Sequence, residues 1–233
     1  PLAIRNDYGY EIIGRMRDRV LLFRDKFNEF EVQAFDNQMH LSWSKELEDL
    51  GRRAIQVVAV IPGRNDFTVI HKVRRKGHTI LRIHKYDPGA NLIDSMTVKD
   101  FGERVFTPPN LEYIQSEDRN CIMVYNDAEH EKMEMVCFRL DKMQVLWDKD
   151  VLLESTDRYD PDPFEMTLSN SGELFFISEK NNKRSRLENH AYQILHIDAA
   201  GDNMFRVPLQ EFQTLDAKFS IDNLNNCLTG VGI

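Results

Sequence analysis

The chain has 233 residues, of which 42% are hydrophobic and 10% aromatic, so it can bury a sizeable core and is not globally disordered. Its net charge of -8 argues against a nucleic-acid partner, and no apolar run approaches the roughly 20 residues that a membrane-spanning helix needs. Three cysteines exclude a complete disulfide framework, and buried free thiols are favoured over a bridge between Cys121 and Cys137.

Short β-rich segments, separated by Asp, Asn, Gly and Pro, follow one another along the chain. Such segments are strand and turn signals. They group in fours, most clearly in the second group, with strands at 55–61, 67–73, 79–87 and 91–98. We expect units at residues 8–50, 51–105, 106–155 and 156–212, followed by an incomplete unit at 213–233.

An Asp closes the third strand of each complete unit. These residues are Asp36, Asp87, Asp141 and Asp198, at intervals of 51, 54 and 57 residues. Four strands repeated at about this period are typical of β-propeller blades. We therefore predict an all-β fold in a single domain over residues 1–233, a β-propeller with four-stranded antiparallel blades. About four blades are complete, and the unfinished fifth suggests a fragment of a larger propeller. The four Asp residues are interpreted as turn-formers, because Asp side chains accept hydrogen bonds from the backbone N–H groups that follow them.

Trp43 and Trp147 lie in the similar segments LSWSKEL (41–47) and VLWDKDV (145–151). A Trp at corresponding places in two repeats is expected to pack between neighbouring sheets, in preference to forming a platform for a sugar.

One hairpin, between residues 71 and 85, is locally basic in an otherwise acidic chain. It is either a solvated turn or a docking surface for an acidic partner. Positive charge confined to one hairpin does not indicate nucleic-acid binding. The candidate partner-binding residues are Lys72, Arg74, Arg75, Lys76 and Arg82.

The acidic segment 148–165 contains a candidate calcium loop, because Ca²⁺ binds several carboxylate and carbonyl oxygens. Its residues are Asp157, Asp160 and Asp162, although the spacing and the Gly of an EF-hand are missing. A solvated, proline-stiffened connection is the competing interpretation. The seven histidines form no metal-binding sequence pair and are interpreted as solvated or packing residues. We expect no cofactor, and the lack of a catalytic motif favours a non-catalytic protein.

Residues 41–47 and 145–151 resemble the outer-strand pattern of quinoprotein-like and related propellers. The glycine-rich repeat of quinone-binding members is missing, so the resemblance implies no quinone. The segment FDNQMHLSW (35–43) resembles uncharacterised propeller proteins of Bacteroidota cell envelopes. The general sequence character of most of the chain resembles them too. That resemblance implies a periplasmic, cell-envelope or secreted location, with a cytoplasmic one left open, and an outer-membrane complex as a partner.

These observations together lead to a functional hypothesis. We expect a non-catalytic interaction platform that binds protein partners, as a subunit of or accessory to a bacterial envelope assembly such as an outer-membrane protein-secretion complex. The alternative is an enzyme at the channel mouth, or a propeller that binds calcium, a carbohydrate or another small ligand.

Overall fold

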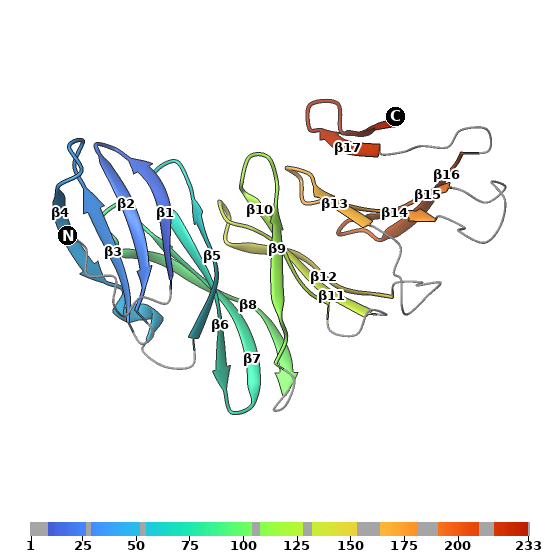
Figure 1. Cartoon of the computed structure of the whole chain (residues 1–233). Helices are drawn as coiled ribbons and strands as arrows, with labels where there is room; N and C mark the ends of the chain where they lie inside the picture. Colours follow the sequence, from blue (N-terminus) through green and yellow to red (C-terminus); the bar gives the residue numbers. More distant parts are fainter. Residues whose placement is uncertain are drawn as a thin grey trace. The chain divides into compact units, whose positions relative to one another are not determined.

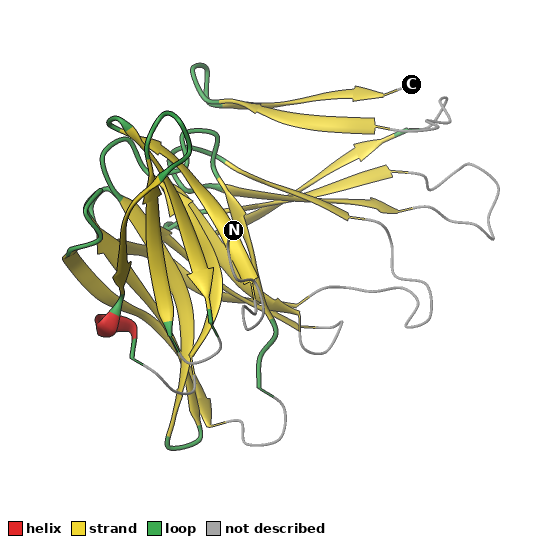
Figure 2. Ribbon diagram, turned by 60° about the vertical axis from the view of Figure 1, so that its left-hand side comes forward, coloured by secondary structure: helices red, strands yellow, loops and turns green. Residues whose placement is uncertain are grey.

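A computed structural model describes residues 9–26, 29–51, 55–103, 108–127, 132–152, 164–180, 191–209 and 217–232. Within these ranges the chain forms 18 β-strands and one turn of 3-10 helix (Figure 2). The chain divides into two compact units, residues 1–109 and 110–233. No helix in the described ranges has the length and apolar character needed to cross a membrane.

The first unit contains two four-stranded antiparallel sheets, each with its strands in sequence order (Figure 1). The first sheet consists of β1 (Gly9–Met16), β2 (Arg19–Asp25), β3 (Phe30–Phe35) and β4 (Leu41–Glu46). After the 3-10 helix η1 (Glu48–Leu50), the second sheet consists of β5 (Ile55–Pro62), β6 (Phe67–Arg75), β7 (His78–Tyr86) and β8 (Leu92–Glu103).

The second unit contains two further sheets of this kind and a two-stranded hairpin. The third sheet consists of β9 (Leu111–Gln115), β10 (Cys121–Asp127), β11 (Lys132–Arg139) and β12 (Gln144–Leu152). The fourth consists of β13 (Phe164–Leu168), β14 (Leu174–Lys180), β15 (Ala191–Ile197) and β16 (Asp202–Pro208). The hairpin consists of β17 (Ala217–Asp222) and β18 (Cys227–Gly232).

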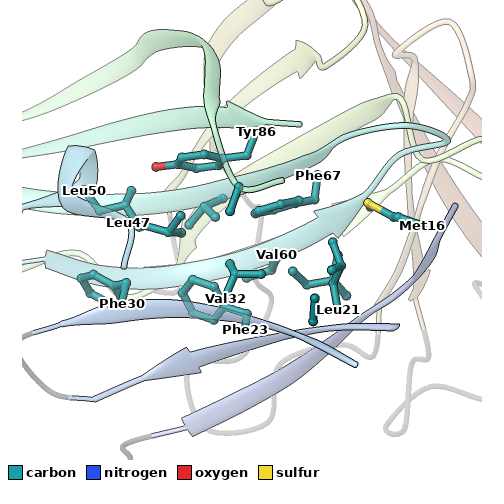
Figure 3. Packing of buried hydrophobic residues seen from close by; sticks show 14 residues of the cluster. Met16, Leu21, Phe23, Phe30, Val32, Leu47, Leu50, Val60, Phe67 and Tyr86 are labelled. Atoms are coloured by element: carbon teal, nitrogen blue, oxygen red, sulfur yellow. The ribbon is translucent and has the colours of Figure 1, made fainter. Parts of the chain in front are cut away.

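The core of the first unit lies between its two sheets, as Figure 3 shows. Val32 and Ala34 of β3 project from one sheet, and Val60, Phe67 and Tyr86 from the other. Alternation along the strands places these side chains on the inward faces. A single sheet would leave this apolar face in water, which is the physical reason that the sheets occur in packed pairs.

In the second unit, Met135 and Trp147 of the third sheet pack with Phe176 of the fourth. Cys121 and Cys137 belong to the same cluster, and both are buried free thiols, as predicted. Burial raises the pKa of Cys121 to about 11 and raises that of Cys137 as well. Both thiols therefore remain protonated at neutral pH.

The predicted all-β class and its four-stranded antiparallel sheets are confirmed. Within each unit, the first strands of successive sheets lie next to one another: β1 beside β5, β9 beside β13, and β13 beside β17. The single domain over residues 1–233 and the number of blades stay predictions.

Candidate functional site

The basic residues predicted to bind a partner lie on the β6–β7 hairpin of the second sheet. The described pairing of β5 with β6 ends at Ile55 and Val73, whereas β6 and β7 stay paired as far as Arg75 and His78. Lys76 and Gly77 form the two-residue turn, with φ of 52° and 84°. Positive φ at both turn positions matches the turn to the twist of a hairpin, and glycine adopts it without a steric penalty.

The structure does not gather the five basic residues on one surface. Because side chains alternate along a strand, Lys72 and Arg74 lie on one face of the hairpin and Arg75 and Arg82 on the other. The Lys72 ammonium donates a hydrogen bond of 2.7 Å to the carbonyl oxygen of Pro109, and partial burial lowers the pKa of Lys72. Arg82 is also partly buried. Lys72 and Arg82 are therefore partly buried within the first unit and are not free to contact a partner in full.

Arg74, Arg75 and Lys76 are exposed at the end of the hairpin, and we call them the basic tip. A hydrogen-bonded pair lies beside them, since His78 Nδ1 of β7 is 2.9 Å from Asp100 Oδ2 of β8. The N–H of Gly102 and the ring of His78 lower the pKa of Asp100, which stays ionised. The basic tip therefore faces solvent with an acidic group on its β8 side.

A buried histidine pair lies within the β6–β7 hairpin, on the face that also carries Arg82. It consists of His71 of β6 and His84 of β7, which are 1% and 3% exposed. Their rings meet edge to face, with centroids 4.9 Å apart, and His84 Nδ1 is 3.3 Å from the Tyr86 hydroxyl oxygen. Burial lowers the pKa of His71 to about 3 and also lowers that of His84, with Arg82 acting in the same direction. Both rings are therefore neutral at pH 7. The interpretation of histidines as packing residues holds for this pair.

The candidate calcium loop, Asp157, Asp160 and Asp162, lies outside the described residues. At the start of the acidic segment, Asp150 of β12 forms an ion pair of 2.8 Å with Lys132 of β11. This carboxylate is therefore part of a cross-strand pair within the third sheet.

The four repeated Asp residues occupy turns between third and fourth strands. Oδ1 of three of them accepts two backbone N–H groups, which confirms the predicted turn-forming role. The donors are Gln38 and His40 for Asp36 (2.8 and 2.9 Å), Gly89 and Asn91 for Asp87 (2.8 and 2.9 Å), and Ala200 and Gly201 for Asp198 (2.7 and 2.8 Å). Asp141 differs, because its carboxylate accepts two hydrogen bonds of 3.0 Å from Arg139.

Both tryptophans contribute to packing between sheets, as predicted. Trp43 packs against the core shared by the first two sheets. Trp147 is buried, and its indole N–H donates a hydrogen bond of 2.8 Å to the carbonyl oxygen of Gly172, in the first turn of the next sheet.

The lysine two residues after each Trp makes a second connection between sheets, which sequence reasoning missed. Lys45 Nζ donates to Asn91 Oδ1 at 2.5 Å, and Lys149 Nζ donates to the Gly201 carbonyl oxygen at 2.7 Å. Each acceptor lies in the Asp-closed turn of the following sheet. The repeated Trp-x-Lys motif and the repeated Asp turn are therefore two halves of one inter-sheet contact.

Replacing Lys149 with methionine is expected to destabilise the second unit by about 1–2 kcal/mol, because a partly buried, charge-assisted hydrogen bond is lost. Chemical denaturation followed by far-UV circular dichroism measures the change. Lys142→Met in the exposed β11–β12 turn is the matched control and should have little effect. Equal effects of the two substitutions would contradict the inter-sheet role.

A second set of bridges in the second unit links the first turns of successive sheets. Asn170 Oδ1 accepts from the N–H of Asp118 at 3.1 Å, and Asn223 Oδ1 accepts from the N–H of Asn170 at 2.8 Å. Asn223 Nδ2 donates to Glu117 Oε2 at 2.9 Å. The sequence signal is an Asn repeated after 53 residues, which is visible only when the turns are aligned.

One group of metal-ligating side chains comes together in the described part of the chain, formed by Glu173, His196 and Asp198 of the fourth sheet. Their ligand atoms lie within 4.8 Å of one another. The sequence places His196 and Asp198 two residues apart, but only the pairing of β14 with β15 brings Glu173 to them.

No family model matches the chain. No curated protein matches it either. Among solved structures, it is similar to an ACO/RPE65 chimera (9% identity, 94% of this chain and 58% of that one, TM-score 0.42). It is also similar to the Aleuria aurantia lectin in complex with alpha-methyl-L-fucoside (8% identity, 81% and 56%, TM-score 0.38). The chain is also similar to a prolyl endopeptidase (12% identity, 91% of this chain and 30% of that one, TM-score 0.44).

The chain thus spans little more than half the length of the first two of these structures. Because the TM-scores are below 0.5 and the identities are 12% or lower, these similarities carry no argument about what this chain does.

Proposed function

We propose that this chain is part of a β-propeller that acts as a non-catalytic platform for protein binding, with the basic tip as its docking surface. The observation that carries the proposal is the exposure of Arg75 and Lys76 at the end of a hairpin in a chain whose net charge is -8. A compact positive region on a negative protein attracts an acidic partner and orients it during encounter.

The propeller part of the proposal is supported by the arrangement within each unit. Sheets of four strands in sequence order place their first strands side by side, as blades do around an axis. The lysine of the Trp-x-Lys motif joins the first sheet to the second and the third sheet to the fourth through the same kind of hydrogen bond. The resemblance of residues 35–43 to envelope propellers supports an envelope complex as the setting of the partner.

The proposal is tested by reversing the charge of the tip. In the Arg75→Glu/Lys76→Glu protein, we expect binding of the native acidic partner to fall at least tenfold, and wild-type binding to weaken as salt is raised. Partner binding is measured by quantitative mass spectrometry of complexes purified from the native source, and then by titration with the isolated partner.

The matched control is Arg119→Glu/Lys142→Glu, which makes the same charge change at two exposed turn residues of the second unit. Like Lys76, Arg119 has a positive φ, of 62°, so the backbone demands are similar. This control should keep the partner. Equal loss in both variants, or retention of the partner by the tip variant, would overturn the proposal.

A further inference from the structure

Glu173, His196 and Asp198 occupy one end and one face of the β14–β15 pair. Phe175 is the register partner of His196, and alternation places Glu173, two residues before Phe175, on the same face. Asp198 lies two residues after His196 on that face. The ligand atoms of the three side chains, one imidazole nitrogen and two carboxylate oxygens, are within 4.8 Å of one another.

The imidazole nitrogen that faces this group is unsatisfied. His196 Nε2 is shielded from solvent, and no hydrogen-bond partner for it is present among the described residues. The nearest oxygen of Glu173, Oε1, is 3.8 Å away, too far for a hydrogen bond. A buried polar atom without a hydrogen-bond partner costs free energy, and coordination to a cation would remove that cost.

Neighbouring groups hold all three side chains in place. Phe175 stacks on the His196 ring, with centroids 4.7 Å apart and 22° between the planes. The hydroxyl of Ser171 donates to Glu173 Oε2 at 3.1 Å. Asp198 Oδ1 is held by the turn, and the N–H groups of that turn lower the pKa of Asp198, which keeps it ionised. Fixed orientation of first ligands by surrounding hydrogen bonds is a common property of metal sites.

We infer that Glu173, His196 and Asp198 form a binding site for a divalent transition-metal ion of the Zn²⁺ type. One imidazole and two carboxylates suit zinc, whereas Ca²⁺ and Mg²⁺ prefer oxygen ligands alone. Zinc bonds of about 2.0–2.2 Å place neighbouring ligand atoms roughly 3.3 Å apart, so the three side chains would draw closer together when zinc binds. Three protein ligands leave at least one coordination position for water or a ligand from solution. This site is separate from the basic tip and does not depend on the proposed platform function.

The test measures zinc binding to the 233-residue chain after treatment with a chelator. The exposed Cys227 is a competing zinc ligand, so the experiments use a Cys227→Ser background. Isothermal titration with ZnCl₂ at pH 7.5 should give one equivalent bound, with MgCl₂ and CaCl₂ giving none. Co²⁺ should give the visible absorption of a site with nitrogen and oxygen ligands.

Glu173→Gln, His196→Gln and Asp198→Asn should each weaken zinc binding at least tenfold. The amide in Asp198→Asn still accepts the hydrogen bonds of the turn, and the melting temperature of each metal-free variant shows that it folds. Asp36→Asn and His40→Gln are the matched controls, because His40 Nδ1 is 3.5 Å from Asp36 Oδ2 in the corresponding turn of the first sheet. These controls should bind zinc normally.

The inference is overturned if the Cys227→Ser protein binds no zinc saturably, or if the three ligand variants match the two controls. The second result would mean that the three side chains stabilise the β15–β16 turn and do not bind metal. In that case His196→Gln would lower the melting temperature without changing zinc binding.

Discussion

Replacing Phe67 with alanine is expected to destabilise the first unit by about 3–5 kcal/mol, the usual cost of removing a buried aromatic ring. Phe67 is fully buried, and its ring stacks on Tyr86 with centroids 5.2 Å apart. Figure 3 shows it among side chains from both sheets of the unit. The vacated space therefore lies between two sheets that are held apart by the remaining side chains, which limits how far it can collapse.

Guanidinium denaturation followed by far-UV circular dichroism measures this loss. Tyr10→Ala in β1 is the control, because Tyr10 is an aromatic residue of the same unit that is 67% exposed. Its substitution should change the free energy of unfolding by less than about 0.5 kcal/mol. If the two substitutions cost the same, the core between the first two sheets would not be the main source of stability of this unit.

The strands of this protein could be located from its sequence because their signals are local. The segment predicted as a strand at 79–87 is β7, His78–Tyr86, and the turn at Pro88 and Gly89 follows it as expected. Alternating apolar residues and turn residues define such an element without knowledge of its neighbours. The turns at Asp36, Asp87 and Asp198 were predictable for the same reason, since these carboxylates bond to N–H groups only two to four residues ahead.

The contacts between sheets could not be predicted in this way. Lys149 and Gly201 are 52 residues apart, and nothing near either residue specifies the other. The basic hairpin shows the same limit, because four of its five charges lie two on each face, the fifth lies in the turn, and two of the five are partly buried. The group formed by Glu173, His196 and Asp198 depends on the register of β14 with β15, which is a property of the sheet.

Lowering the pH from 6.5 to 5 is expected to destabilise the first unit by roughly 2 kcal/mol through His71 alone. Burial holds the pKa of His71 at about 3 in the folded protein, against an ordinary value of 6.5. Between these two values the unfolded chain binds a proton that the folded protein does not. The contribution of His71 to the free energy of unfolding is therefore complete well above pH 6.5. It falls as the pH decreases toward 3, by about 1.4 kcal/mol for each pH unit.

The surroundings of His71 explain why it resists protonation. A proton on His71 would be placed beside His84, whose pKa burial also lowers, and near the positive charge of Arg82, its register partner in β7. The Tyr86 hydroxyl near His84 is itself kept neutral, because burial and Asp49 raise the pKa of Tyr86. Asp49 favours a charge on His84, but burial outweighs it.

The substitution His71→Phe isolates this effect, because it keeps an aromatic ring against His84 and removes the titrating group. Denaturation curves at pH 6.5, 6.0, 5.5 and 5.0 should show a shallower loss of stability in His71→Phe than in the wild-type protein. This window lies above the range in which the turn carboxylates Asp36 and Asp87 titrate, since the pKa of each is held below its ordinary value of 3.8. His40→Phe, at an exposed position, should keep the wild-type slope. An unchanged slope in His71→Phe would mean that His71 is protonated in the folded protein as readily as in the unfolded chain. Water would then reach the His71 ring.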